Sequence, residues 1–359
     1  MRRLDRYLAV SYAAAVALTL AVLCAVYLLV DFADHARLFH GEGWPSAALE
    51  LYAAKLAVIV AQLVPAALIL GAGIALTRLR GQGELTAASA LGCSPGRLVA
   101  PALAVAMLAG AGLSVFSDRV VPRAEHRVQQ IAIERFHLWG DWGRFHGQHW
   151  FRMGDRFIRL GAAQDGGWRD VTVLEMETTG GVFHLRQRID AASLVRNGDG
   201  WSLIGATVRT FDAANTIVES HAQRLDAGPF DPAGLVVDES RPSELSNAEL
   251  DQHAAARQAS ALPSGEFILL RMQRNAAAFL GVPGTAISAA ATLRRRRRGG
   301  LTTALLEGAA LTALLWALTV VSRALALGGH LPPWLGAWGV DLFAAGGGAW
   351  ALARARMTK

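Results

Sequence analysis

The sequence has little lysine and little cysteine. Arginine supplies nearly all of the positive charge, because Lys55 and Lys359 are the only lysines among 35 basic residues. Neither lysine follows a glycine, so the chain has no phosphate-binding loop of the G-x-x-x-x-G-K-[ST] type. Cys24 lies in an apolar run and Cys93 in a polar loop. Two cysteines so placed exclude a disulfide scaffold, and we expect no bridge between them.

Residues for catalysis or metal binding are also scarce. No cysteine–histidine spacing typical of a zinc site occurs. His146 and His149 are close together, but they lie on an aromatic-rich approach to a strand, where we expect ordinary surface or stacking residues. No arrangement suggests a Ser-His-Asp triad. We therefore expect a protein that is not an enzyme and that binds no cofactor and no metal itself.

Long apolar runs are abundant, and 53% of the residues are hydrophobic. The first run, Leu8–Val30, has no charge and is about 35 Å long as a helix, enough to cross a bilayer. It is too long for a cleaved signal peptide, so we expect an uncleaved signal anchor. Six spans are predicted in all: Leu8–Val30, Leu56–Leu76, Leu98–Phe116, Ala276–Leu293, Leu301–Ser322 and Trp334–Ala353.

Basic residues predict the orientation of these spans. With a cytoplasmic N-terminus, the cytoplasmic segments are the N-terminal residues, 78–97, 294–298 and the C-terminal tail. They hold most of the arginines outside the central insert, and their only acids are Asp5 and Glu84. The loop around His330, on the other side, has no charged residue. We interpret the "RRRRR" run at 294–298 as a topology anchor and not as a nucleic-acid site.

A polar insert separates the third and fourth spans. It contains short runs of β-forming residues, such as "DVTVLEME" and "GVFHLRQRI", separated by the turn signals "MGDR", "QDGG", "TTGG", "NGDG" and "DAAN". Such spacing predicts a sandwich or jelly roll. Helical stalks are expected on either side, the second with Ser246 as N-cap and Glu249 three residues on. The predicted domains are therefore 1–117, 118–262 and 263–359, with the insert facing the periplasm.

The stretch "RGQGELTAASALGCSPGRL" (residues 80–98) predicts a short cytoplasmic helix at about residues 84–91. Gly81 and Gly83 are expected to end the helix of the second span. Glu84 indicates the start of a new helix, because a carboxylate in the first turn interacts favourably with the positive end of the helix dipole. Gly92 ends the helix. Ser94 and Pro95 are an N-cap and first helical residue for the next one.

Several strings resemble one family along nearly the whole chain. They are "LDRYLAVSY…VDFADHAR", "VPAALILGAGIALTRLRGQGELTAASALGCS", "FRMGDRFIRLG…WRDVTVLEM" and "LPPWLGAWGVDLFAAGGGAWALARAR". In this order and spacing they resemble the LptF/LptG (YjgP/YjgQ) permeases of lipopolysaccharide export. "LDRY" and "VDFAD" favour the LptG side. The resemblance implies six transmembrane helices plus an all-β periplasmic jellyroll-like domain.

The resemblance also implies partners. Such a chain would sit in the bacterial inner membrane with both termini cytoplasmic. It would pair with a second LptF/LptG-type permease and an LptB-like ATPase dimer, which supplies the ATP hydrolysis. LptC-like and LptA-like β-jellyroll proteins would carry lipopolysaccharide onward.

Candidate site residues follow from the same resemblance. Residues of the cytoplasmic helix would couple to the ATPase: Glu84, Leu85, Ala88, Leu91 and Gly92. Arg37, Arg271 and Arg274 would contact lipid phosphates, for which the arginine fork is suited. For Arg271 and Arg274, snorkelling or pairing with Glu266 is an equal alternative. Glu307, inside the fifth span, is either a snorkelling or helix-paired carboxylate or a transport residue.

Two other functions stay open. The first is a mechanotransmission permease like the MacB/FtsX group, which moves a periplasmic domain without carrying lipid. The second is an envelope scaffold without a transport cycle. A proton-coupled carrier is disfavoured, because ionisable residues within the spans are sparse.

Overall fold

The computed structural model describes residues 2–40, 43–136, 149–153, 155–161, 163–164, 167–179, 182–197, 200–211, 217–227, 242–259, 264–294 and 300–355. The chain forms two compact units. The first, helical, unit comprises residues 1–136, 240–251 and 265–359. The second comprises residues 137–239 and 252–264 and contains the sheet. The helix after the third predicted span thus belongs to the helical unit, although the sequence placed it with the insert.

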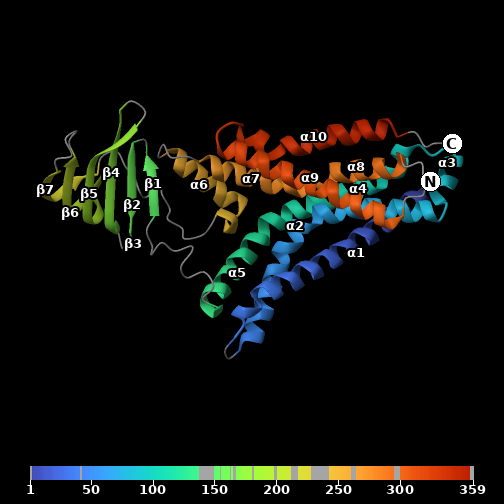
Figure 1. The fold of residues 1–359 in the computed structure, drawn as a ribbon, viewed down its shortest axis with the longest axis horizontal. Helices are drawn as coiled ribbons and strands as arrows, with labels where there is room; N and C mark the ends of the chain where they lie inside the picture. The colour runs from blue at the N-terminus through green and yellow to red at the C-terminus, as the bar shows by residue number, and fades with distance from the viewer. Residues whose placement is uncertain are drawn as a thin grey trace. The chain divides into compact units, whose positions relative to one another are not determined.

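The helical unit is built mainly from long helices (Figure 1). They are α1 (Arg2–His35), α2 (Trp44–Gly81), α3 (Glu84–Ala90), α4 (Pro95–Arg119), α5 (Val121–Phe136), α7 (Gly265–Phe279), α8 (Gly281–Arg294), α9 (Leu301–Leu327) and α10 (Pro333–Ala353). Among the described residues, the 3-10 turn η1 (Ala36–Leu38) lies between α1 and α2, and η3 (Pro242–Glu244) precedes α6 (Asn247–Ala259), whose residues are divided between the two units. Ser246 and Glu249 form the predicted capping box of α6.

Five stretches in the described part of the chain are long and apolar enough to cross a membrane: α1, α2, α4, α7 with α8, and α9. The predicted sixth span, α10, forms a helix of 21 residues. It is not one of the five, because its glycines, tryptophans and Asp341 lower its mean hydropathy. The sixth crossing therefore stays a prediction.

The fourth span is longer than predicted and is broken. It covers Gly265–Arg294 and not only Ala276–Leu293, with an interruption at Leu280 between α7 and α8. Pro283 explains the break, because it has no backbone N–H and its ring crowds the carbonyl of Phe279, four residues earlier. The charged residues of α7 conceal its first turns from a search for apolar runs.

Small residues let the helices approach closely. A Cβ on Gly281 would lie 2.5 Å from Leu68 Cδ1, and one on Gly71 would lie 2.7 Å from Val16 Cγ2. Glycine is therefore required at both crossings. Nearby, the buried hydroxyl of Tyr12 in α1 lies 2.9 Å from Thr285 Oγ1 in α8 and donates to the carbonyl of Leu68 in α2 at 3.1 Å. These contacts bind three helices together.

One end of the helical unit gathers the arginine-bearing helix ends. A buried apolar cluster there joins α1, α2, α3, α4 and α8 through Leu8, Leu79, Leu85, Leu98 and Leu293, with Leu352 of α10 packed against it. Figure 1 shows α3 and both chain termini at this end. We call it the arginine end. At the opposite end, Phe39, Leu51 and Ile131 join the end of α1, the start of α2 and α5.

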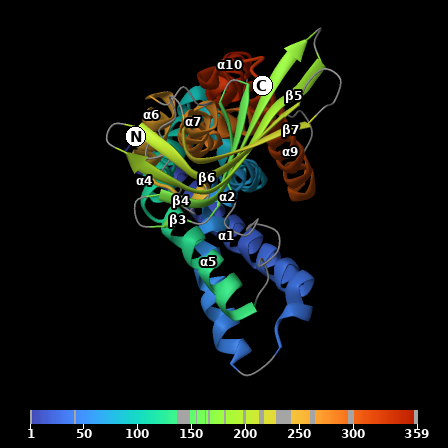
Figure 2. The same cartoon turned by 90° about the vertical axis from the view of Figure 1, so that its left-hand side faces the viewer.

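The described residues of the second unit form an antiparallel sheet of seven strands. They are β1 (His149–Met153), β2 (Arg156–Leu160), β3 (Ala163–Gln164), β4 (Gly167–Thr179), β5 (Val182–Asn197), β6 (Gly200–Phe211) and β7 (Ile217–Asp226). The order is β1-β2-β4-β5-β6-β7, with β3 paired to β4. The all-β prediction is confirmed, and the described strands form one meander. Figure 2 shows how strongly the long strands twist. His149 begins β1, whereas His146 lies outside the described residues, as do parts of the predicted turns.

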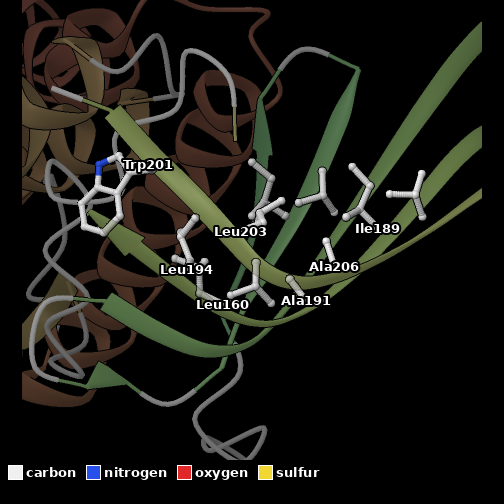
Figure 3. Close-up of a cluster of buried hydrophobic side chains, with 11 residues drawn as sticks. Leu160, Ile189, Ala191, Leu194, Trp201, Leu203 and Ala206 are labelled. Carbon is white, nitrogen blue, oxygen red and sulfur yellow. The ribbon is translucent and has the colours of Figure 1, made fainter. Parts of the chain in front are cut away.

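One face of the sheet carries the apolar core. Figure 3 shows the side chains of the cluster, including Leu160, Leu194 and Leu203, gathered on one side of the bent strands. Trp201 and Leu203 are buried on β6, and then Ala206 and Val208, so the alternation changes phase at Gly205.

A crease across the sheet causes this change of phase. Gly205 has a φ of +63° and Asp170 on β4 a φ of +53°. One residue in each of four strands, at the same level of the sheet, has no partner in the ladder, although the residues on either side of it are paired. These residues are Asp170 on β4, Ala192 on β5, Gly205 on β6 and Gln223 on β7. Interruptions of this kind bend strands, as β-bulges do, so the sheet curves around its apolar face.

Candidate functional site

The short helix α3 has the boundaries that the sequence predicted. Gly83 precedes it with a φ of +78° and Gly92 follows it with a φ of +80°, both in the left-handed region that favours glycine. Ser94 caps the next helix by accepting from the backbone N–H of Arg97 at 3.4 Å, and Pro95 is its first residue. The chain thus turns sharply before and after α3, and α3 is a separate rigid element at the arginine end.

The five residues predicted to couple to an ATPase divide between two faces of α3. Leu85 and Ala88 are buried and pack in the same cluster as Leu8 and Leu293. In this chain these two side chains belong to the packed core, and a direct contact with an ATPase through them stays a prediction. They hold α3 against the ends of the neighbouring helices.

The opposite face of α3 is open. Leu91 is 85% exposed, the most exposed of the large apolar side chains in the described residues, and Gly92 is exposed beside it. Thr86, Ala87 and Ala90 are also exposed. We call Thr86, Ala87, Ala90 and Leu91 the docking face. It is small, apolar and rigid, so it can fit a shallow groove on a partner.

Glu84 lies beside the docking face in the first turn of α3. Its Oε1 accepts a hydrogen bond of 3.0 Å from the hydroxyl of Tyr7 in α1. This carboxylate has one more oxygen and free lone pairs, and it can therefore accept from an additional donor. A basic group of a partner is the natural candidate, because a charge-assisted bond is stronger than a neutral one.

Arginine side chains fasten the arginine end. Arg80, in the last turn of α2, donates to the carbonyl of Leu293 at 3.0 Å, near the end of α8. A cation at this position interacts favourably with the negative, C-terminal end of the α8 dipole. Arg354 stacks over the Trp350 ring at 4.4 Å and covers the end of α10. The Arg80 bond thus joins α2 to α8 at the arginine end, whereas the Arg354 contact lies within the end of α10.

The three arginines predicted to bind lipid phosphate lie in different surroundings. Arg37, in η1, is exposed and has no polar partner among the described residues. Arg271 on α7 donates to Asp251 Oδ1 at 2.7 Å, and both side chains are nearly half exposed. Neither Arg271 nor Arg274 bonds to Glu266 in the described part of the chain.

Arg274 is partly buried in a polar hub. It donates to the carbonyls of Leu245 at 2.8 Å and Ser243 at 3.2 Å, and it reaches Asn247 Oδ1 at 3.4 Å. The backbone N–H of Asn247 in turn donates to Asp118 on α4 at 2.8 Å. Arg274 thus ties α7 to the chain that returns from the insert, and these bonds occupy much of its donor capacity.

A buried ion pair at the end opposite α3 was not recognised in the sequence. Lys55 Nζ lies 2.6 Å from both carboxylate oxygens of Asp31, and Tyr52 donates to the same carboxylate at 3.0 Å. The Asp31 side chain is 12% exposed and that of Lys55 24%. The rarity of lysine was the available signal, since an isolated lysine among arginines suggests a site that needs a compact charge.

Asp341 was also missed. It is only 9% exposed in α10, and its Oδ1 has no hydrogen-bond partner. A buried carboxyl without a partner is costly. Glu307 lies two turns inside α9 on a face that this chain leaves exposed. No group of three or more potential metal ligands occurs among the described residues.

A comparison with family models now identifies the chain's relatives. The model of the lipopolysaccharide export system permease LptF/LptG matches residues 6–354. The chain belongs to the LptF/LptG family. The match covers both groups of helices and the sheet between them, and the chain is thus a transport subunit of the lipopolysaccharide export permease type. The family model does not distinguish LptF from LptG. A comparison with curated proteins finds no match.

Proposed function

We propose that this permease is the membrane subunit of an ABC-type complex that extracts lipopolysaccharide from the bacterial inner membrane and is driven by a separate ATPase. The observation that carries the proposal is α3: a rigid helix at the arginine end with an exposed apolar docking face and Glu84 beside it. The absence of a phosphate-binding loop lysine from the sequence supports an external source of ATP hydrolysis.

The proposed ATPase is an LptB-like dimer on the cytoplasmic side. Leu91 and the rest of the docking face would fill its groove, and Glu84 would meet a basic group at the rim. The arginine end would be cytoplasmic by the positive-inside rule, which puts both termini there and the sheet unit in the periplasm.

Two helices offer apolar surface for a second permease and for lipid. In the most apolar part of α1 only 6% of the residues are buried within this chain, and in α9 only 17%, against 44% in α2. Large exposed side chains on them include Leu18, Val22, Leu314 and Trp316. An apolar membrane helix that its own chain leaves uncovered is available to lipid and to other helices. We propose that α1 and α9 border a lipid cavity shared with a second LptF/LptG-type permease.

Lipid phosphates would be bound at the mouth of this cavity, at the end opposite α3. Arg37 is the best placed of the three candidates, because its guanidinium is exposed and has no polar partner among the described residues. Arg271 would have to exchange Asp251 for phosphate, which its exposure permits. Arg274 would hold the segment before α6 in place, since it donates to the backbone carbonyls of Ser243 and Leu245.

The bent sheet would receive the acyl chains. Its buried face is lined by aliphatic residues along β2, β4, β5 and β6. Its edge strands β1 and β7 each pair on one side only in the described sheet. An open edge can add a strand of another protein, as an LptC-like or LptA-like neighbour would require.

Co-purification and crosslinking test this function. Tagged permease should co-purify with the ATPase, and a photoreactive residue at Val22 should crosslink to lipopolysaccharide during ATP hydrolysis. Glu84→Arg should abolish ATPase binding. Gln82→Arg, which introduces an arginine at an exposed residue before α3 and leaves Glu84 in place, is the control and should retain it. A permease that binds no ATPase and crosslinks no lipopolysaccharide contradicts the proposal, and full export by Glu84→Ala would favour a scaffold.

A further inference from the structure

In the part of the chain that the structure describes, a single hydrogen bond links the short helix α3 to the far longer helix α1. The hydroxyl of Tyr7 donates to Glu84 Oε1 across 77 residues of sequence. Tyr7 is 47% exposed, so its ring serves little as an apolar core contact. Its neighbour Leu8 is buried in the cluster that contains Leu85. The start of α1 thus touches α3 with one apolar and one polar group.

The bond matters because it is the polar link between these two helices in the described residues, beside the apolar cluster that contains Leu8 and Leu85. α1 packs extensively against α2 and α4, whereas α1 and α3 are not among the closely packed pairs. Glu84 lies in the first turn, after a glycine that provides no side-chain cap. Its carboxylate would otherwise rotate freely. Tyr7 fixes one oxygen and leaves the other for a partner, so the carboxylate is presented in one orientation.

The helix that donates this bond, α1, is long and continuous. α1 has 34 residues without a break, about 50 Å at the rise of an α-helix. Its other end bears Asp31, which is tied to Lys55 on α2. Between these two polar contacts lies the largely uncovered apolar face. A displacement of α3 can therefore reach the lipid-facing helix through Tyr7, without passing through α2 or α4.

We propose that Tyr7 is a positioning residue that orients Glu84 for the ATPase and transmits movement of α3 to α1. This inference rests on the proposed function, in which Glu84 contacts the ATPase. Chain connectivity joins α3 only to α2 and α4, so the Tyr7 bond adds a third route. Loss of the hydroxyl should uncouple ATP hydrolysis from lipid movement more than it weakens ATPase binding.

The test uses the complete permease with its co-purified ATPase in proteoliposomes that contain lipopolysaccharide. Tyr7→Phe removes only the hydroxyl, and Tyr27→Phe is the matched control, an exposed tyrosine of the same helix without a polar partner in the described chain. We expect Tyr7→Phe to lower the lipopolysaccharide released per ATP hydrolysed about fivefold, the effect of one hydrogen bond. Tyr27→Phe should leave this ratio unchanged.

A double-variant comparison separates positioning from stability. If Tyr7 acts through Glu84, Tyr7→Phe should have no further effect on the ratio in a Glu84→Ala background, which removes the acceptor. Glu84→Gln, which keeps an acceptor for Tyr7, should retain more coupling than Glu84→Ala. An unchanged ratio in Tyr7→Phe, or independent effects of the two substitutions, would overturn the inference. If Glu84→Ala itself changes neither ATPase binding nor export, the proposed function fails as well.

Discussion

Breaking the ion pair between Lys55 and Asp31 should loosen α1 from α2. The two helices meet there through two 2.6 Å contacts from one ammonium to both oxygens of a largely buried carboxylate. Lys55→Met leaves Asp31 with the Tyr52 hydroxyl at 3.0 Å and the His35 ring at 3.7 Å as its side-chain partners. An unpaired buried charge costs about 3–5 kcal/mol, whereas an exposed pair contributes about 0–1 kcal/mol. With Lys55 24% exposed, we expect a loss of about 2 kcal/mol.

A double-variant cycle isolates the pair. Lys55→Met combined with Asp31→Asn removes both charges, so the double variant should be more stable than Lys55→Met alone. Arg37→Met, at an exposed cation of the same end, should change stability by less than about 0.5 kcal/mol. The measurement is thermal unfolding of the purified permease in detergent. Strictly additive effects of the two substitutions, or a Lys55→Met variant as stable as the parent, would refute the reasoning.

Three further substitutions test other parts of the fold. Gly336→Ala should lower the free energy of unfolding by about 1–3 kcal/mol, because the added methyl would overlap a side chain of α9. Gly339→Ala has room for the methyl and should be neutral or slightly stabilising in thermal unfolding. Equal losses of stability in the two variants would contradict this packing. Asp341→Asn should keep or raise the melting temperature, because it removes a buried carboxyl whose Oδ1 lacks a partner; a clear decrease would reveal a partner for that charge. Burial raises the pKa of Asp190 on β5, but hydrogen bonds and charge from Arg188 and neighbouring strands lower it overall below its ordinary value of 3.8. The stability that ionised Asp190 gives to the folded sheet is thus present above a pH of 3.8 and is lost as the pH falls through the lowered pKa. Hydrogen-exchange protection of β4 to β6 should show this acid-dependent loss in the parent and not in Asp190→Asn; identical profiles would exclude it.

The boundaries of α3 were predictable because each depends on a local residue. Gly83 and Gly92 permit left-handed backbone, and Ser94 caps the next helix through its own side chain. The orientation of α3 was not predictable. Leu85 and Leu91 are both leucines in one short helix, and only the packing of α3 on the ends of α1 and α8 decides which of them is buried.

The sheet was recognisable, but its alternation was only partial. The crease at Asp170, Ala192 and Gly205 explains why, since it shifts the buried positions by one residue in several strands at once. No single strand reveals that shift. The broken fourth span was hidden in a similar way, because its first half carries Arg271 and Arg274, whose partners lie on chain segments far away in sequence.

Contacts between distant residues could not be derived from the sequence. Tyr7 finds Glu84 only after α2 has crossed the unit and returned the chain to the arginine end. Lys55 finds Asp31 because α1 and α2 are antiparallel neighbours. The family resemblance supplied Glu84 as a coupling residue, but its partner within the chain depends on the packing of three helices.

Crosslinking from Leu91 tests the central claim most directly. A photoreactive amino acid at this 85% exposed position should crosslink to the ATPase in intact cells. The control places the same photoreactive amino acid at position 108, where Leu108 is 74% exposed but lies within the apolar part of α4. This variant should not crosslink to the ATPase. A crosslink from position 91 and none from position 108 is the predicted result. No ATPase crosslink from position 91, in a permease that still exports lipopolysaccharide, would contradict the assignment of α3 as the coupling helix.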